Sequence, residues 1–376
     1  MSDVTSVPMP FGVETLDLEG YELEALLGSG GIATVYRARR VIDDERFAIK
    51  VIATSLSKTT RDRFELEAQL GLRIQHPDIV RVYDYGETPE VLWIAMELLD
   101  GVDLSQLQYD FRFGFRDRLR VIVRVARALQ AAHDVQVFHR DVKPSNIFVT
   151  DDGGVKLLDF GISKVAGYRL TRTDVTNGTP RYMAPEQILG HRVDARADVF
   201  SLAVVAYELL TGQTPWSGDT PMASMMATCS QPPPPFVQAV AQGGLELERD
   251  VAVRLHRVLH RALDTERERR HASADAFADE VEAILAGQCT DSDTDLTAPG
   301  GSWAGRRFDW AKARAQRALV SESSDLPKER AASDPGVKDP FDEDGAYAHR
   351  MWLALLAAFL VAMALVLFQL FFVEGA

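Results

Sequence analysis

Three short polar motifs in the middle of the chain restrict its fold more than any other feature. HRDVKPSN occupies His139–Asn146, LLDFG follows it with Asp159 at the centre, and APE occupies Ala184–Glu186. Each motif alone would occur by chance in a chain of 376 residues, whereas the ordered set would not. The set as a whole therefore predicts one particular fold for the region around it.

A glycine-rich segment, GSGGIATVY at Gly28–Tyr36, lies between the β-type runs YELEALL and VYRARR. As the turn between two strands, it would let backbone amides approach a polyphosphate, because glycines carry no blocking side chain. An ordinary glycine-rich turn is the alternative that the residues leave open. A Walker A loop is excluded, since no Gly-Lys-Ser/Thr ends the segment, and no Rossmann-type helix follows it.

The run FAIKV places Lys50 in an otherwise apolar strand, where a lysine is costly unless it has anionic partners. Lys50 either extends to the surface or neutralises phosphates while a carboxylate holds it. The candidate carboxylate lies in the helix-like run RFELEAQLGLRIQHP, where Glu67 shares a face with Leu70 and Ile74. Glu65 is the competing choice, but it points away from that face.

Together these motifs resemble the eukaryotic-type (Hanks-type) protein kinase family, in which HRDxKPxN, DFG and APE follow in this order at compatible distances. The resemblance covers residues 21–286, and GSGGIATVY, HPDIVRVYDYG and MAPEQ are similar to the bacterial members. It implies an α+β, two-lobed fold with a small β-rich N-lobe and a larger helical C-lobe. Lys143 and GTPRYMAPE resemble the serine/threonine branch, which implies transfer of the γ-phosphate of ATP to serine and threonine hydroxyls of protein substrates.

The resemblance also implies the roles of the catalytic loop. Phosphoryl transfer depends mostly on positioning and on neutralising charge. Asp141 would accept the proton of the substrate hydroxyl, and Lys143 would steady the γ-phosphoryl group as it moves. Asn146 and Asp159 would hold Mg²⁺, with Mn²⁺ as an alternative, because oxygen ligands suit a hard cation.

An ATP site follows from the same resemblance, with Lys50 and Glu67 forming the ion pair that closes it. Val35 and Ala48 would cover the adenine, and Met96 would be the gatekeeper. The backbone of Glu97 and Leu99 would supply the adenine hydrogen bonds. The implied nucleotide-binding residues are Gly28, Ser29, Gly30, Gly31, Ile32, Ala33, Val35, Ala48, Lys50, Met96, Glu97, Leu99 and Phe148.

Two residues depart from the family pattern. Ala33 stands at the place of the third loop glycine, and Phe148 stands where the family often has a smaller aliphatic residue. Both predict weakened or reshaped ATP binding and not its loss. A pseudokinase would have lost the lysine, the catalytic aspartate or a metal ligand, and only Ala33 favours that reading. Kinases of small molecules or lipids share the chemistry, but GTPRYMAPE resembles the protein kinases.

The activation segment, Asp159–Glu186, contains Thr171, Thr173 and Thr176 as candidate phosphosites. A phosphothreonine carries about −1.5 to −2 charges and would order the segment by pairing with Arg140. The alternative is that these threonines are solvated loop residues. The spacing of Thr171 and Thr173 resembles that of related bacterial kinases, so we expect autophosphorylation there, in trans through a transient homodimer.

The resemblance implies structural supports as well. We expect Glu186 to pair with Arg270, and Asp198 to brace the catalytic loop from a continuous apolar helix. His76 and His139 are interpreted as packed structural histidines, without a catalytic role.

The run Met351–Val373 contains no charged residue. As a helix it would span on the order of 34 Å, enough for a hydrocarbon core near 30 Å. Apolar residues cover every face, which favours a membrane helix over an amphipathic or buried one. No signal peptide is visible in residues 1–20, and a weak positive-inside bias applies. We therefore expect a single-pass protein of the cell (inner) membrane, with a cytoplasmic kinase domain and residues 374–376 outside.

The remaining composition limits the partners. Residues 287–350 are polar and acidic, with few apolar residues to repay the entropy of ordering, which predicts a juxtamembrane linker. Within it, the basic stretch 303–319 is either a membrane-surface helix or part of the solvated linker. The net charge of −14 argues against a nucleic-acid partner, and two cysteines argue against a disulfide framework. We expect membrane-anchored signalling, with the bilayer as a partner.

Overall fold

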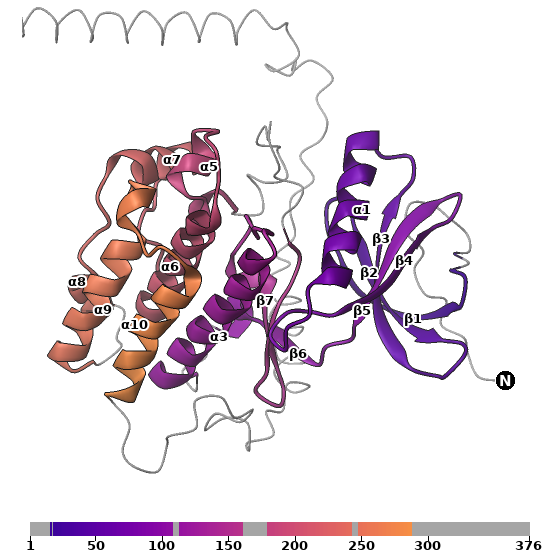
Figure 1. Ribbon diagram of the computed structural model, residues 1–376, viewed down its shortest axis with the longest axis horizontal. Helices are drawn as coiled ribbons and strands as arrows, with labels where there is room; N and C mark the ends of the chain where they lie inside the picture. The colour runs from indigo at the N-terminus through magenta and orange to yellow at the C-terminus, as the bar shows by residue number, and fades with distance from the viewer. Residues whose placement is uncertain (1–15, 17, 108–112, 161–178, 243–246, 288–376) are drawn as a thin grey trace, which may run out of the picture. The chain divides into compact units, whose positions relative to one another are not determined.

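The computed structural model describes residues 16, 18–107, 113–160, 179–242 and 247–287 (Figure 1). The described chain starts with strands that pack on one long helix and continues into a mostly helical part. This arrangement confirms the expected β-rich N-lobe and helical C-lobe. Residues 288–376, which include the predicted membrane helix, lie outside the described residues. Within the described ranges, none of the helices combines the length and the apolar character that crossing a membrane requires.

The N-lobe is a five-stranded antiparallel sheet in the order β1-β2-β3-β5-β4. The turn between β1 and β2 carries the glycine-rich segment, as the sequence predicted. Helix α1 begins at Lys58, where the Ser57 side chain accepts a hydrogen bond from the amide of Thr60. The bounds are β1 Tyr21–Ser29, β2 Thr34–Arg40, β3 Arg46–Ala53, α1 Lys58–Arg73, β4 Val82–Glu87 and β5 Val91–Glu97.

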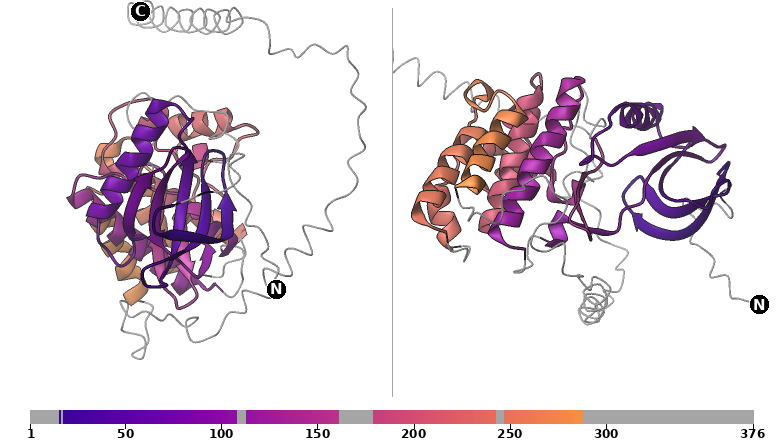
Figure 2. Two further views of the ribbon diagram at one scale, coloured as in Figure 1. Left: turned by 90° about the vertical axis from the view of Figure 1, so that its right-hand side faces the viewer. Right: turned by 60° about the horizontal axis from the view of Figure 1, so that its bottom comes forward.

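Both faces of this sheet are packed, because residues alternate between the faces along each strand. One face buries an aromatic cluster that includes Phe47 and Trp93, which Leu18 and the partly buried Leu16 also join. The other face packs Ile52 and Ile94 against Phe64 of α1. Figure 2 shows α1 lying against one face of the curved sheet. This packing fixes α1 relative to β3, the strand that carries Lys50.

The C-lobe is built around α6, whose residues are buried along almost its whole length. Helices α3, α8, α9 and α10 all contact it. Asp194 begins α6 by accepting a hydrogen bond from the amide of Arg196, and Gly212 ends it at a φ of 78°, a left-handed conformation that glycine adopts without strain. The helix bounds are α2 Leu104–Leu107, α3 Phe115–Asp134, α5 Pro185–Ile188, α6 Ala195–Thr211, α7 Pro221–Ser230, α8 Phe236–Gln242, α9 Arg249–Ala262 and α10 Ala274–Ala286.

A small second sheet, in the order β6-β7-β8, carries the ends of the catalytic loop. Its strands are β6 Gly101–Asp103, β7 Ile147–Thr150 and β8 Val155–Leu157, and three 3₁₀ turns lie at Pro144–Asn146, Thr179–Tyr182 and Arg267–Arg269. Strand β7 directly follows the loop that contains Asp141, and β8 ends two residues before Asp159. The amide of Leu158 donates to the carbonyl of Asn146 at 2.8 Å, so the two candidate metal-binding segments are held side by side.

Candidate active site

Lys50 joins the two lobes through two carboxylates. Its Nζ lies 2.8 Å from Oε1 of Glu67 on α1 and 2.7 Å from Oδ1 of Asp159, which follows β8. The lysine side chain is 13% exposed, whereas that of Asp159 is 47% exposed. The ion pair predicted between Lys50 and Glu67 is thus present, and no contact assigns a similar place to Glu65.

The charges of this cluster influence one another. Burial works against the Lys50 ammonium, but the carboxylates of Asp159 and Glu67 outweigh burial and hold the pKa of Lys50 well above its ordinary value. Burial raises the pKa of Glu67, and the lysine offsets only part of that effect. Burial also opposes the Asp159 carboxylate, yet the Lys50 charge lowers the pKa of Asp159. Of the two carboxylates, Asp159 therefore stays ionised more readily than Glu67.

The loop before β7 gathers three polar side chains. Nζ of Lys143 lies 3.0 Å from Oδ2 of Asp141. The amide nitrogen of Asn146 donates to the backbone carbonyl of Asp141 at 2.9 Å and lies 3.3 Å from its carboxylate. These contacts fix the orientation of Asp141 through residues that follow it by only a few positions. The predicted grouping of Asp141, Lys143 and Asn146 is present, and their catalytic roles stay predictions.

Asp198 on α6 holds the backbone of this loop, as expected. Its buried carboxylate accepts hydrogen bonds from the amides of His139, at 2.8 Å, and Arg140, at 2.7 Å. His133 adds a third contact of 2.8 Å through Nε2, which the sequence analysis missed because nothing in its spacing marks it. Burial opposes the charge of Asp198, but the hydrogen bond from His133, the nearby histidines and the amide of Arg140 together outweigh it, so the pKa of Asp198 is lowered.

Two residues of the site adopt left-handed backbone conformations, Arg140 at a φ of 62° and Asp159 at 46°. Such conformations cost a residue with a side chain about 1–3 kcal/mol and persist only where the surroundings impose them. Here the Asp198 carboxylate holds the amide of Arg140, and Lys50 holds the carboxylate of Asp159. His139, which precedes Arg140, contacts the carbonyl of Leu158 just before Asp159. It is fully buried and packs on Phe160, in agreement with its predicted structural role.

The residues present fit a magnesium ion. Because the Asn146 amide nitrogen is engaged by Asp141, its oxygen is the group left for a cation, and Asp159 offers a carboxylate. Mg²⁺ is usually bound by one or two such protein ligands together with substrate phosphates. Among the described residues, no group of three or more histidine, cysteine or acidic side chains could hold a metal by itself. Bound there, the ion would neutralise phosphate charge beside Asp159.

The predicted nucleotide-facing side chains share one face of the N-lobe sheet. Val35 pairs with Lys50 across β2 and β3, and Ala48 pairs with Met96 across β3 and β5. Directly opposite residues of antiparallel strands point to the same face, and Ala48 and Lys50 are two positions apart. Met96 also packs partly on the cluster beneath α1. The four residues therefore lie together, as an adenine-covering surface requires.

The glycine-rich turn is closed by a hydrogen bond from the amide of Gly30 to the carbonyl of Ala33, at 2.8 Å. A Cβ atom at Gly28 would meet no protein atom within 4 Å, so the space beside it is open to a ligand. The remaining turn residues, Gly31 and Ile32, are exposed. Ser29 ends β1. Ala33 packs its methyl group partly on the α1 cluster, so this departure from glycine has a structural use.

The segment after β5 makes contacts that the sequence did not predict, and the adenine hydrogen bonds expected from the backbone of Glu97 and Leu99 stay predictions. The Glu97 amide donates to the carbonyl of Arg81 at 2.8 Å, so this N–H is already engaged within the protein. The Glu97 side chain turns to Lys156 of β8, a contact of 2.8 Å that sequence reasoning missed. Leu99 is half-buried. Phe148 of β7 is also half-buried and pairs with Asp103 of β6.

The activation segment is described only at its two ends. The candidate phosphosites Thr171, Thr173 and Thr176 lie outside the described residues. The guanidinium of Arg140 has no carboxylate partner within the part of the chain that the structure describes. At the end of the segment, Glu186 forms the predicted pair with Arg270, at 2.8 Å.

A two-lobed domain that holds a lysine between two carboxylates, above a loop with an aspartate, a lysine and an asparagine, has the architecture of the protein kinases. Residues 21–281 match the family described as the protein kinase domain. The chain belongs to this family.

Curated relatives of the chain include bacterial serine/threonine-protein kinases. The chain is 35% identical over 289 residues to the serine/threonine-protein kinase PknA of Mycobacterium tuberculosis, covering 74% of this chain. It is 35% identical over 277 residues to the serine/threonine-protein kinase pkn3 of Myxococcus xanthus. With the probable serine/threonine-protein kinase PknB of Corynebacterium glutamicum it shares 38% over 225 residues. The matched regions span 64%, 50% and 35% of these relatives' own lengths.

Proposed function

We propose that the chain is an active serine/threonine protein kinase that transfers the γ-phosphate of ATP to hydroxyl groups of protein substrates. The observation that carries this proposal is Lys50, held at 2.7 Å from Asp159 and 2.8 Å from Glu67. The residues whose loss would mark a pseudokinase, Lys50, Asp141 and the metal-binding Asn146 and Asp159, are all present. The relatives' printed names support the same activity.

The reaction would proceed by direct transfer. The substrate hydroxyl gives its proton to the Asp141 carboxylate as its oxygen forms a bond to the γ-phosphorus. The bond from that phosphorus to the β–γ bridging oxygen breaks, and ADP leaves with the electron pair. Lys143, at 3.0 Å from Asp141, lies where it can pair with the moving phosphoryl group, and Lys50 can pair with the phosphates that stay behind.

The test is transfer of radiolabelled γ-phosphate from ATP with Mg²⁺, with mapping of the labelled residues. The full chain should label itself and a basic protein substrate, and the Asp141→Asn variant should lose at least about a hundredfold in rate. Label on Thr171 or Thr173 would support autophosphorylation of the activation segment. If the full chain and the variant incorporate equal label, the chain acts as a scaffold and the proposal fails.

Autophosphorylation is proposed to occur between two copies of the chain. The initial rate per molecule should then rise with protein concentration, and an active chain should label the Asp141→Asn variant added to it. A rate per molecule that does not change on dilution would show that each chain labels itself, and would contradict the transient homodimer.

Residues 351–373 are proposed to anchor the kinase domain on the cytoplasmic side of the cell membrane. Their uncharged length supports the proposal. After alkaline carbonate extraction, the full chain should remain with the membrane pellet, and a chain shortened by these residues should appear in the supernatant. Release of the full chain by carbonate would contradict the anchor. Protease added outside intact cells should leave the kinase domain uncut.

A further inference from the structure

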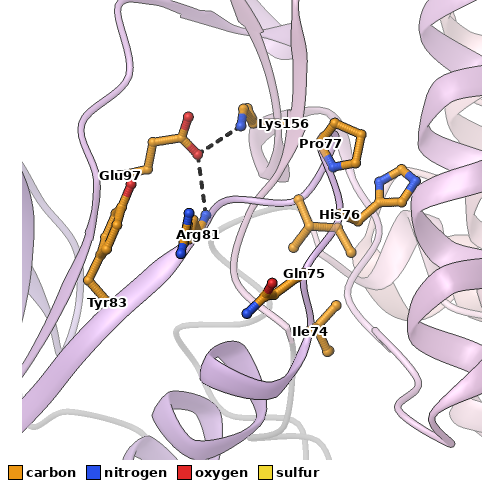
Figure 3. Close-up of a pocket in the computed structure, with 9 residues that line it drawn as sticks. Ile74, Gln75, His76, Pro77, Arg81, Tyr83, Glu97 and Lys156 are labelled. Atoms are coloured by element: carbon orange, nitrogen blue, oxygen red, sulfur yellow. Dashed lines mark hydrogen bonds and ion pairs between the residues drawn. The ribbon is translucent and has the colours of Figure 1, made fainter.

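A cavity of about 400 Å³ lies behind Glu97, on the side to which its carboxylate points (Figure 3). Its walls come from the segment that follows α1, from β4, from the end of β5 and from β8. The volume lies within the usual range for small-molecule sites, roughly 300–1,000 Å³. None of the residues assigned above to catalysis lines it, and of the nucleotide-binding residues only Glu97 does so.

One wall of the cavity is fixed to the C-lobe. The amide of Leu157 in β8 donates to the carbonyl of Asp78 at 2.8 Å, and the amide of Val80 donates back to Leu157 at 3.0 Å. The buried Asp78 carboxylate also accepts a hydrogen bond from Nε of Arg124 on α3, at 3.0 Å. His76, which lines the cavity just before these residues, is held by the Asp78 amide at 3.1 Å.

The opposite wall belongs to the N-lobe sheet. Tyr83 lies on β4, which pairs with β5 from Val82 onward, and Arg81 directly precedes that strand. Glu97 joins the two walls: its carboxylate accepts from Lys156 of β8 at 2.8 Å and from the amide of Arg81 at 3.3 Å. The cavity is therefore bordered by both lobes at the point where the chain crosses between them.

The charge of this cavity favours an anion. Arg81 and Lys156 are cationic, and Glu97 compensates only one of them. Burial lowers the pKa of His76, so the imidazole adds no charge at neutral pH. The Arg81 guanidinium is stacked 5.0 Å from the ring centroid of Tyr83 and has no carboxylate partner among the described residues. The cavity thus carries an uncompensated positive charge, that of Arg81, although the chain as a whole has a net charge of −14.

The rest of the lining comes from Gln75 and from the apolar surfaces of Ile74, Pro77, Ile79 and the ring of Tyr83. Polar groups that converge beside apolar and aromatic surface can fix the orientation of a small molecule. We propose that this cavity binds a small organic acid, whose carboxylate pairs with the guanidinium of Arg81 and whose planar apolar body packs between Tyr83 and Pro77.

Such a ligand would contact both lobes. Because Glu97 also belongs to the segment that faces the nucleotide, the ligand stabilises one arrangement of the lobes over the others. Its binding is therefore coupled to nucleotide binding, and each ligand changes the affinity of the other by the same factor. We expect a factor of about 3 to 10.

The probe is 4-fluorobenzoate, observed by ¹⁹F NMR line broadening with the full chain in detergent micelles. The Arg81→Gln variant keeps the backbone contacts of Arg81 and loses its charge, so it should bind the probe about tenfold more weakly. The matched control is Arg257→Gln, at an exposed arginine of α9, which should bind as the wild type does. The neutral 4-fluorobenzamide and inorganic phosphate test the carboxylate and the apolar body separately, and both should bind more weakly.

Three results together would support the site. The broadening should be saturable, it should persist with Mg²⁺ and ADP in excess, and of the two variants only Arg81→Gln should weaken it. A probe affinity that keeps falling as nucleotide is raised, without levelling off within about tenfold, would place the probe in the nucleotide site and overturn the proposal. Equal binding by the two variants, or by the amide and the acid, would also overturn it. An ADP affinity that is unchanged by saturating probe would refute the coupling. None of these measurements requires kinase activity, so they stand apart from the proposed function.

Discussion

The guanidinium of Arg270 and the carboxylate of Glu186 meet through two parallel hydrogen bonds of 2.8 Å each in the interior of the C-lobe. The Arg270 side chain is fully buried, and it also donates to the carbonyl of Asp264 at 2.7 Å. The pair thus ties the end of the activation segment to the segment before α10. A buried pair of this kind is strongly destabilising to break, because one charge is left without a partner.

Replacing Glu186 by glutamine should therefore lower the free energy of unfolding by about 3 kcal/mol or more. Urea unfolding followed by tryptophan fluorescence would measure the change. The matched control is Arg269→Gln, one residue away, where the pair with Glu266 is about two-thirds exposed and should contribute less than about 1 kcal/mol. Equal effects of the two substitutions would contradict the assigned structural role of Arg270.

Gly101 offers a second test of the fold, at the start of β6. Its φ is +150°, and a Cβ atom there would overlap the carbonyl oxygen of Val149 and lie 2.8 Å from Cα of Thr150. Gly101→Ala should push β6 away from β7 and cost more than about 3 kcal/mol of stability, since backbone atoms cannot move aside as a flexible side chain can.

The control for that substitution is Gly190→Ala. Gly190 has a φ of +69° with nothing within 4 Å of an added Cβ, so only the backbone conformation is penalised, by about 1 kcal/mol. Thermal unfolding of the two variants should rank them clearly. A Gly101→Ala variant as stable as Gly190→Ala would mean that β6 and β7 adjust without cost.

Sequence reasoning located the parts of the site that are carried by linear motifs. Lys50, Asp141 and Asp159 each stand at a fixed place in such a motif, and the contacts of Lys50 with Glu67 and of Arg270 with Glu186 were expected from them. The strand, turn and strand around the glycine-rich segment were also expected, because alternation and glycine content are local properties.

The contacts that were missed join residues far apart in the chain. His133 reaches Asp198 from another helix, and Lys156 reaches Glu97 from the other lobe. Neither lies in a local pattern, because a histidine near the end of a helix or a lysine on a short strand is ordinary in composition. The engaged amide of Glu97 depends on how β4 and β5 pair, which periodicity does not specify.

Asp198 predicts a pH dependence with a definite sign. Its pKa in the folded protein is lowered below the unfolded value of about 3.9, so its contribution to stability is present above that value and is lost as the pH falls through the folded pKa. The difference in unfolding free energy between the wild type and Asp198→Asn should shrink as the pH falls below about 4.

Taking the difference between the two proteins removes the titration of all other carboxyl groups, which acid affects equally in both. Urea unfolding at pH 7, 5, 4 and 3 would suffice. A difference that is the same at pH 3 as at pH 7 would show that Asp198 is not held as a carboxylate. The same substitution should lower the rate of phosphoryl transfer, because asparagine offers one acceptor oxygen where the carboxylate offers separate oxygens to the amides of His139 and Arg140.

The contribution of Glu67 to stability should depend on pH in the opposite direction to that of Asp198. Its folded pKa is raised, first by burial, so the ionised carboxylate is less favourable in the protein than in water. The contribution of Glu67 to stability is then present below the unfolded pKa of about 4.3 and is lost as the pH rises through the folded pKa. At pH 7, Glu67→Gln should unfold no more easily than the wild type, yet it should transfer phosphate about 10 to 100 times more slowly, because Lys50 loses the partner that positions it.

Lys50→Met, by contrast, leaves two carboxylates without their cation and should lower both stability and activity. Chemical unfolding beside a kinase assay would separate the two effects, and a Glu67→Gln variant that is less stable at pH 7 would mean that the ion pair stabilises the fold as well as positioning Lys50.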